Sequence, residues 1–425
     1  MKITRLALPS AALVVALAAT TSGAATAAPA PVAAQTPVAA NSSDEVDAAN
    51  QARYDHVVSL LPANWEQRRD AARQRFGIDH SPVEDVLAGK MEHAEAQWRD
   101  GAAVIDPTDY ECGPTALDGY VDGILADVDP FSVLLLSLLG GLDVPTYEAL
   151  LFGSPKDADF AVAADYRERL TTSFGYNQRF WDVKLSDVQL LGMHGEMITD
   201  LNRSARTLEF LYGVGPADAV EIATTIAEIV ESDPALDGGA HPLFTLNAFA
   251  FTGEGDPDPV IRKLKDKVVF GDGILDAMKS LGLGKTGPDA VLAHEVAHHV
   301  QYENDLFDSD LDAPEATRRT ELMADGFGTY FAVHKKGLGI KPAQVLEVAK
   351  SFAAVGDCSF TSPGHHGTPN QRRAASAWGA AEVAYSNNPQ KVLPSLKLAQ
   401  RFEKILPELV APDAPTTVQG FAPAA

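Results

Sequence analysis

The sequence predicts an α+β protein that is mostly α-helical, and three observations lead to this fold class. Apolar residues recur at three- and four-residue spacing through the first half of the chain, for example over 188–212. Two short runs rich in β-branched and aromatic residues, 242–252 and 267–270, predict strands. Helical patterns then resume to about residue 385. With 46% hydrophobic and 22% charged residues, the chain has the composition of a globular protein.

The N-terminus has the pattern of a secretory signal peptide, residues 1–28. Lys2 and Arg5 precede an apolar run over 6–19, and Ala25-Thr26-Ala27 forms a small-residue cleavage site. An uncleaved anchor is the alternative, but the apolar run is shorter than the ~20 residues that a spanning helix needs. We therefore expect a secreted or extracytoplasmic protein with no membrane span after signal removal.

Charge and cysteine content narrow the possible partners. The formal net charge is −24, and removing the signal, with two basic and no acidic residues, would make it −26. So acidic a surface argues against nucleic acid as a partner, because phosphate contacts need Lys and Arg. Two cysteines, Cys112 and Cys358, form either a disulfide or two unpaired thiols. The sequence gives no oligomeric state.

Breaks in composition suggest five segments. After the signal, residues 29–50 form an Ala- and Pro-rich flexible linker. Residues 51–236 are expected to form a helical N-terminal region, and residues 237–386 a second domain that holds the strands. Residues 387–425 are expected to form a C-terminal helix and a loose tail. Three tryptophans, Trp65, Trp98 and Trp181, are expected in the core, and His194 is expected to be a packed or capping residue.

The chemistry-bearing motif is His294-Glu295-Val296-Ala297-His298, on a helix expected to open near Thr286 or Gly287. Histidines at positions i and i+4 lie on one helical face, so both imidazoles can reach one metal ion. Glu295 can address a water bound to that metal. This H-E-x-x-H pattern is typical of zinc proteases in which the glutamate is the general base.

A catalytic zinc ion usually has three protein ligands and an open position, so a third ligand is required. Gln301 and Asn304 exclude the extended pattern H-E-x-x-H-x-x-G-x-x-H. The next helix, expected over 314–336, offers Glu321 and Asp325 on one face. We predict Glu321 as third ligand and Asp325 as acceptor for a ligand-histidine N–H, the alternative being a surface acidic pair.

Two features next to the metal motif are expected to have no part in zinc binding. His299 is rotated about 100° from the ligand His298 on a helix, so we expect it to be a neighbour contact or surface residue. The aspartates between the two helices are expected to form a solvated loop, with calcium binding as the alternative; they are Asp305, Asp308, Asp310 and Asp312.

Together these stretches resemble a family, the gluzincin metallopeptidases. The chain is similar to soluble relatives of the CAAX prenyl endoproteases, which carry N-A-F-A, a strand-to-helix G-L-L segment, V-L-A-H-E-x-x-H and E-x-x-A-D. It also resembles the bacterial neutral zinc metallopeptidases, with H-E-x-x-H-H-V-Q, R-x-E-L-x-A-D and H-G-T-x-x-Q-R. The corresponding stretches here are 247–250, 270–275, 291–301, 319–325 and 366–372. The resemblance covers about residues 240–380.

The resemblance implies a zincin-like catalytic domain, in which a small sheet accompanies an active-site helix and a Glu-bearing helix. It implies one Zn²⁺ ion on His294, His298 and Glu321, with Glu295 as base. It also implies that His366 and Arg372 approach the substrate carbonyl. Asn247 would bind the substrate backbone. The sequence departs from the family in Gly367, where proline is usual, and the adjacent His365 leaves open which histidine faces the site.

These features predict a secreted zinc endopeptidase that cleaves protein or peptide substrates through a metal-activated water. A zinc-stabilised extracytoplasmic binding protein without turnover is the first alternative. A zymogen held latent by the helical N-terminal region is the second.

Overall fold

A three-stranded mixed sheet lies among the helices, with strand order β1-β3-β2. The strands are β1 (Gln189–Met193), β2 (Ala248–Phe251) and β3 (Lys267–Gly271). The central strand β3 runs parallel to β1 and antiparallel to β2, and all of its residues are buried. Because helices cover both faces of the sheet, its central strand is buried along its whole length, with three consecutive apolar residues after Lys267.

The computed structural model describes residues 42–76, 110, 115–341, 344, 348–350 and 365–423. The signal peptide, most of the linker, Cys112, Cys358 and Trp98 lie outside these residues.

The helices before the metal motif are α1 (Ser42–Leu60), α2 (Trp65–Phe76), α4 (Ala116–Ile124), α5 (Pro130–Leu138), α6 (Val144–Phe152), α7 (Ala164–Phe180), α8 (Leu201–Tyr212), α9 (Pro216–Ser232) and α10 (Asp272–Ser280). Those that follow are α11 (Gly287–Tyr302), α12 (Ala313–Val333), α14 (Pro369–Ala384) and α15 (Ser395–Leu409). The expected class, α+β and mostly α, is confirmed.

Contacts cross the domain boundary expected at residues 236/237. The described residues from Asp44 onward belong to one compact unit. Strand β1 comes from the region expected to be mainly helical, and Leu191 pairs with Val269 across the expected boundary. The core is likewise continuous, and it includes the buried tryptophans Trp65 and Trp181.

The expected strand at 242–252 is shorter than its composition suggested. Its first part forms the 3₁₀ helix η6 (Pro242–Thr245), and only Ala248–Phe251 joins the sheet. Pro242 fits the first position of a helix, and the His241 side chain accepts a hydrogen bond from the Leu243 N–H. Local capping at the start of the run therefore overrides its β propensity.

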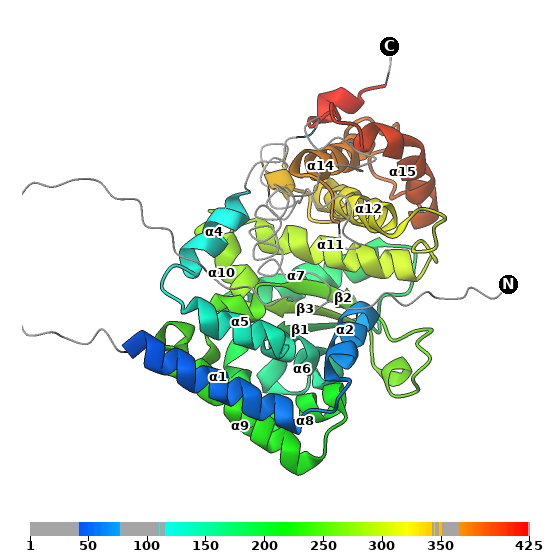
Figure 1. Cartoon of the computed structure of the whole chain (residues 1–425). Helices are drawn as coiled ribbons and strands as arrows, with labels where there is room; N and C mark the ends of the chain where they lie inside the picture. The colour runs from blue at the N-terminus through cyan, green and yellow to red at the C-terminus, as the bar shows by residue number, and fades with distance from the viewer. Residues whose placement is uncertain are drawn as a thin grey trace, which may run out of the picture. The chain divides into compact units, whose positions relative to one another are not determined.

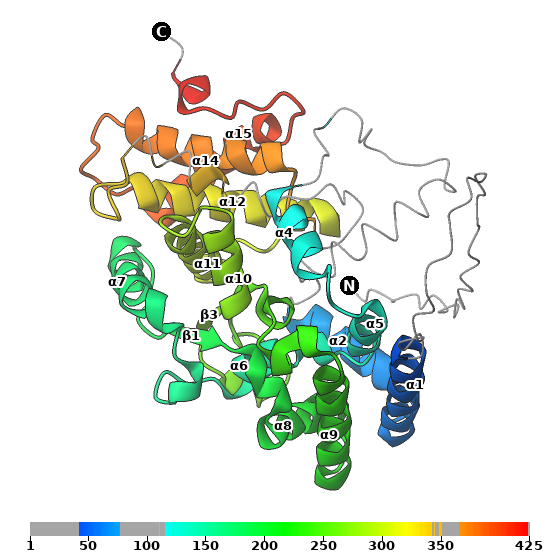
Figure 2. The ribbon, with the colours of Figure 1, turned by 90° about the vertical axis from the view of Figure 1, so that its left-hand side faces the viewer.

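Helices are stacked on one face of the sheet in the order α11, α12, α14 (Figure 1). The turned view shows the same order, with α6 on the opposite side of the sheet (Figure 2). Helices α12 and α14 approach closely at Gly326 and Gly379. A Cβ added at Gly379 would lie 2.1 Å from the Gly326 carbonyl oxygen, so this crossing requires glycine.

The end of the chain is more ordered than the expected loose tail. The short 3₁₀ helix η8 (Val418–Phe421) packs on α14, and Ala414 is buried. Its contacts with α14 order the segment after α15, although its composition is rich in proline and alanine.

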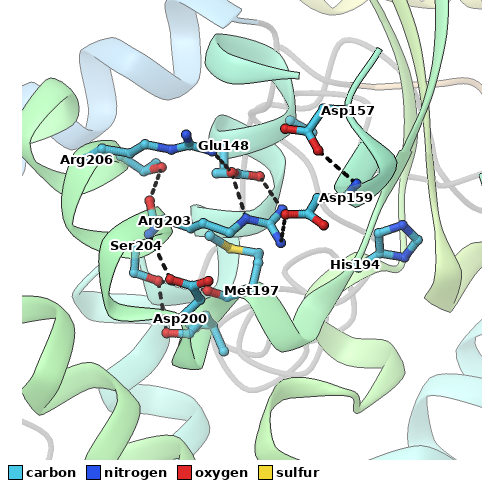
Figure 3. A network of polar contacts seen from close by, with 12 residues as sticks. Glu148, Asp157, Asp159, His194, Met197, Asp200, Arg203, Ser204 and Arg206 are labelled. Carbon is cyan, nitrogen blue, oxygen red and sulfur yellow. Dashed lines mark hydrogen bonds and ion pairs between the residues drawn. The ribbon is translucent and has the colours of Figure 1, made fainter. Parts of the chain in front are cut away.

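A buried carboxylate joins α6 to α8 (Figure 3). Glu148 accepts hydrogen bonds from Arg203 Nε at 3.0 Å and Arg203 Nη2 at 2.9 Å. Arg206 also contacts this carboxylate, and Asp159 lies 3.8 Å from Arg203. A buried charge must be paired in this way, so the network fixes the two helices against each other.

The strongly apolar run at 131–142 divides between α5 and the start of the 3₁₀ helix η2 (Gly141–Asp143). Within the described residues, no single helix is both long and apolar enough to cross a membrane. One bent pair, Pro130–Leu138 with Gly141–Phe152 at 78°, meets the length and composition criteria together.

Candidate metal centre

The helix that carries the metal motif is anchored at its N-terminus. Pro288 lies in its first turn, and Thr286 precedes it without a side-chain cap. Asp289 accepts hydrogen bonds from Arg169 Nε at 2.8 Å and from Ser173 Oγ at 2.6 Å, both on α7. A carboxylate in the first turn also suits the helix dipole. This end of α11 is therefore fixed against α7.

Three side chains converge where α11 faces α12. His294 and His298 lie one turn apart on α11, with their Nε2 atoms 3.1 Å apart. Glu321 of α12 places Oε2 3.2 Å from His294 Nε2 and Oε1 3.2 Å from His298 Nε2. One ligand atom from each residue lies within 4.8 Å of the others. This buried group could bind a metal ion.

Hydrogen bonds on the far side of each ring orient the imidazoles. His294 Nδ1 lies 2.9 Å from Asp325 Oδ1, and His298 Nδ1 lies 2.8 Å from Gln301 Oε1. Both acceptors hold a proton on Nδ1, which leaves the Nε2 lone pairs directed at the common point. The predicted contact between Asp325 and a ligand histidine is present.

Gln301 is the residue of this site that the sequence interpretation missed. Its amide oxygen accepts from His298, and its Nε2 donates to the Thr320 carbonyl oxygen at 2.8 Å. The second bond fixes which end of the amide faces the histidine. The sequence does contain a sign of this contact, because Gln301 follows His298 by three residues and so lies on the same helical face.

The carboxylates of Glu321 and Asp325 favour a positive charge at the centre, whether a proton on His294 or a metal ion that displaces it. Burial alone would lower the pKa of His294, but hydrogen bonds from its ring to Asp325 and Glu321 raise it to about 10. Burial opposes ionisation of Glu321, yet the charges and hydrogen bonds of His298 and His294 hold its pKa well below the usual value. Two nitrogen donors and one carboxylate match the ligand set of zinc sites that keep an open position.

Glu295 lies beside the three converging residues and is almost fully buried. Burial raises the pKa of its carboxyl above the usual value, and the neighbouring His294 and His298 partly offset that rise. A carboxylate whose pKa is raised toward neutrality is a better proton acceptor than an exposed one. Its environment is therefore suited to a general base.

Arg372 lies behind the ligands, close to α12. Its Nε donates to Asp325 Oδ2 at 2.7 Å and its Nη2 to Asp325 Oδ1 at 2.8 Å. Nη2 also lies 3.7 Å from Glu321 Oε2. The resemblance implied that Arg372 approaches the substrate carbonyl, whereas these contacts direct its buried guanidinium to two carboxylates. We interpret Arg372 as a positioning residue.

Comparison with known proteins adds no relative to this geometry. No family model matches the chain, and neither a curated protein nor a solved structure matches it. Any functional assignment therefore rests on the residues of the site alone.

The histidine pair before α14 lies beside the Glu-bearing helix. A Cβ added at Gly367 would lie 3.2 Å from Leu322 Cδ2 and 3.5 Å from Arg318 Cγ, which places the segment on α12 next to Glu321. Gly367 has φ +94°, a conformation that proline cannot adopt. His365 is fully buried, whereas His366 is half-buried, so His366 is the histidine that keeps accessible surface.

Asn247 lies at the start of the edge strand. Its carbonyl oxygen accepts the Gly271 N–H at 3.0 Å, and its side chain is half-buried. Among the residues that the structure describes, β2 pairs with β3 on one side only, and α11 packs beside it. The outer edge of β2 therefore keeps backbone groups that are not part of the sheet.

Of the two alternatives expected for His299, the neighbour contact is confirmed and the surface position is wrong. The ring is 1% exposed, and its Nε2 donates to the Lys267 carbonyl oxygen at 2.9 Å. Burial lowers its pKa to about 4, so the ring is neutral near pH 7. Because α11 lies on the sheet, its face away from the ligands meets β3 instead of solvent.

In the aspartate loop, Asp312 caps α12 by accepting the Glu315 N–H.

Proposed function

We propose that this protein is a secreted zinc-dependent endopeptidase of the gluzincin type. The observation that supports the proposal most strongly is the buried group of His294, His298 and Glu321 with both histidine Nδ1 atoms held by side-chain acceptors. Glu295 lies next to this group. A site that served only to hold metal would have no need of that glutamate.

In this proposal each residue has one task in peptide-bond hydrolysis. Zinc, held by His294, His298 and Glu321, would supply Lewis acidity that lowers the pKa of a water and polarises the scissile carbonyl. The Glu295 carboxylate accepts the proton from the attacking water and delivers it to the leaving amine nitrogen. His366 is the candidate donor to the oxyanion, and one such donor is worth roughly 10²–10³ in rate.

The edge strand β2 is the candidate platform for substrate. An extended peptide can add to a free strand edge through main-chain hydrogen bonds. Ala248 and Ala250 are half-buried there and carry small side chains. Asn247, at the start of the strand, is the candidate contact for the substrate backbone. Pairing with β2 would place a peptide beside α11.

Two alternatives make different claims about the same site. A zinc-stabilised binding protein would keep the metal and show no turnover. A zymogen would need a removable inhibitory region, but residues 189–193 form strand β1 of the sheet. Removal of residues 51–236 would therefore take away part of the core, which disfavours that alternative.

The decisive experiment compares Glu295→Gln with the unaltered chain and with Glu303→Gln, an exposed glutamate at the end of α11. Zinc content and cleavage of an unfolded protein substrate are measured for all three. We expect Glu295→Gln to keep zinc and lose cleavage, while Glu303→Gln keeps both. Equal cleavage by Glu295→Gln would refute the mechanism. Full zinc occupancy without cleavage by the unaltered chain would favour the binding protein.

A further inference from the structure

Two aromatic rings extend the metal centre beyond the last turn of α11. Tyr302 and Phe307 are stacked, with ring centroids 4.5 Å apart and an interplanar angle of 13°. The Phe307 ring also lies 6.0 Å from the ring of the candidate ligand His298. Tyr302 contacts His299 edge-on at 5.7 Å. We call Tyr302 and Phe307 the aromatic shelf.

The loop that carries Phe307 is held in place by backbone hydrogen bonds. The Leu306 N–H donates to the Gln301 carbonyl oxygen at 3.0 Å. Arg319 Nη1 donates to the Leu306 carbonyl oxygen at 2.7 Å, and Arg319 is itself paired with Glu403. The position of Phe307 is therefore fixed from both neighbouring helices.

Phe307 nevertheless keeps a large accessible area. It is 39% exposed, although it packs on Tyr302 and borders the ring of His298. A residue that served only to cover the ligand would bury more of its ring. Exposed apolar surface at the edge of a polar site is instead typical of a wall that a ligand side chain completes.

The shelf also lies along the course expected for a substrate. Tyr302 follows His298 by four residues and Glu295 by seven, so all three lie on one side of α11. The same helix packs against the edge strand β2. A peptide that pairs with β2 and reaches the metal centre would direct a side chain next to the cleaved bond toward this end of α11.

We propose that the aromatic shelf selects substrates with an aromatic or large aliphatic side chain on a residue that flanks the cleaved bond. The inference rests on the proposed function, whose substrate class it specifies. Aromatic rings prefer offset-stacked or edge-to-face contacts, both of which an exposed ring offers. A side chain that lacks this contact should be discriminated against by about 10-fold or more.

The test measures binding separately from cleavage. Two peptide hydroxamates that differ only in one side chain, benzyl or methyl, are titrated into the zinc-loaded chain, and the same side-chain pair is compared in peptide cleavage. We expect the benzyl compound to bind about 10-fold or more tightly. Phe307→Ala should bring the two affinities close together with zinc content unchanged, and Phe307→Leu should retain part of the preference. Leu311→Ala, an exposed apolar residue of the same loop, is the matched control and should keep the full preference.

The outcomes separate the two proposals. Equal affinity of the two hydroxamates for the unaltered chain, or no binding of either, would overturn the shelf. Loss of zinc from Phe307→Ala would overturn it as well, because Phe307 would then be a cover for the ligand. A benzyl preference in a chain that cleaves no peptide would support the shelf and refute the endopeptidase. Cleavage without any preference would refute the shelf alone.

Discussion

Arg372 holds Asp325 through two parallel hydrogen bonds, Nε to Oδ2 at 2.7 Å and Nη2 to Oδ1 at 2.8 Å. The same carboxylate faces Nδ1 of His294. One buried acid therefore links α14 through α12 to a candidate ligand on α11. Each charged group thus has a partner in the interior. An unpaired buried charge there would be strongly destabilising.

Replacing Asp325 with asparagine should weaken metal binding. Asparagine keeps the size of the side chain but lowers the basicity that Asp325 lends to His294, so we expect zinc affinity to fall about 10–100-fold. Competition with a chromophoric chelator measures this change. Asp127→Asn, an exposed turn residue, is the control and should retain the affinity of the unaltered chain. Unchanged affinity in Asp325→Asn would contradict the role given to Asp325.

Arg372→Lys separates a positioning role from direct contact with substrate. Lysine keeps the charge but cannot form the two parallel bonds, so Asp325 loses its fixed orientation. We expect zinc affinity to fall together with kcat/KM, and excess zinc to restore much of the activity. If Arg372 were an oxyanion donor, the substitution would instead lower kcat and leave zinc affinity unchanged. That result would show that Arg372 contacts the substrate.

Both ends of the Gln301 side-chain amide should contribute to zinc affinity. Gln301→Leu leaves Nδ1 of His298 without its acceptor, and an unpaired buried polar group costs about 1–3 kcal/mol. Gln301→Glu keeps the acceptor but loses the donor to Thr320. We expect Gln301→Glu to bind zinc more tightly than Gln301→Leu in the same chelator competition. The reverse order would show that the bond to Thr320 matters more.

The metal residues were predictable because they depend on helical periodicity alone. The four-residue steps from His294 to His298 and from Glu321 to Asp325 place each pair on one face, whatever the rest of the fold. That these two faces meet is a tertiary fact. The sequence suggested it only through the pattern of ligands that zinc requires.

Strand β1 and the burial of His299 were not predictable in this way. Gln189–Met193 is a short apolar stretch that also fits helical spacing, and it becomes a strand because it pairs with β3, 78 residues away. Strand propensity depends on such partners more than on the local sequence. His299 is buried for the same reason, since β3 lies against that face of α11.

Removing one partner from the buried ion pair of Glu148 should be strongly destabilising. Glu148→Ala leaves Arg203 largely buried without its carboxylate, and breaking such a pair costs about 3–5 kcal/mol. Urea unfolding measures the change in the free energy of unfolding. Glu228→Ala removes an exposed partner of Arg53 and should cost only about 0–1 kcal/mol. Similar losses in the two variants would show that burial of Glu148 does not set its contribution.

His194 should stabilise the fold in a pH-dependent way. Its Nδ1 lies 2.6 Å from Asp272 Oδ2 and its Nε2 3.0 Å from the Ala161 carbonyl oxygen, so both nitrogens face acceptors. The hydrogen bond to Asp272 raises the pKa of His194, although burial opposes the rise. A folded-state pKa above the unfolded value, about 6.5, gives stability that is fully present below that value. It is lost as the pH rises through the folded-state pKa.

A double-mutant cycle of His194→Gln and Asp272→Asn isolates this contribution from the other titrating groups. The coupling free energy, measured by urea unfolding, should be about 1 kcal/mol or less because the pair is partly exposed. It should be larger at pH 5.5 than at a pH above the folded-state pKa of His194, where the imidazole is neutral. A coupling that grows with pH would mean that Asp272 binds the neutral ring more tightly than the charged one.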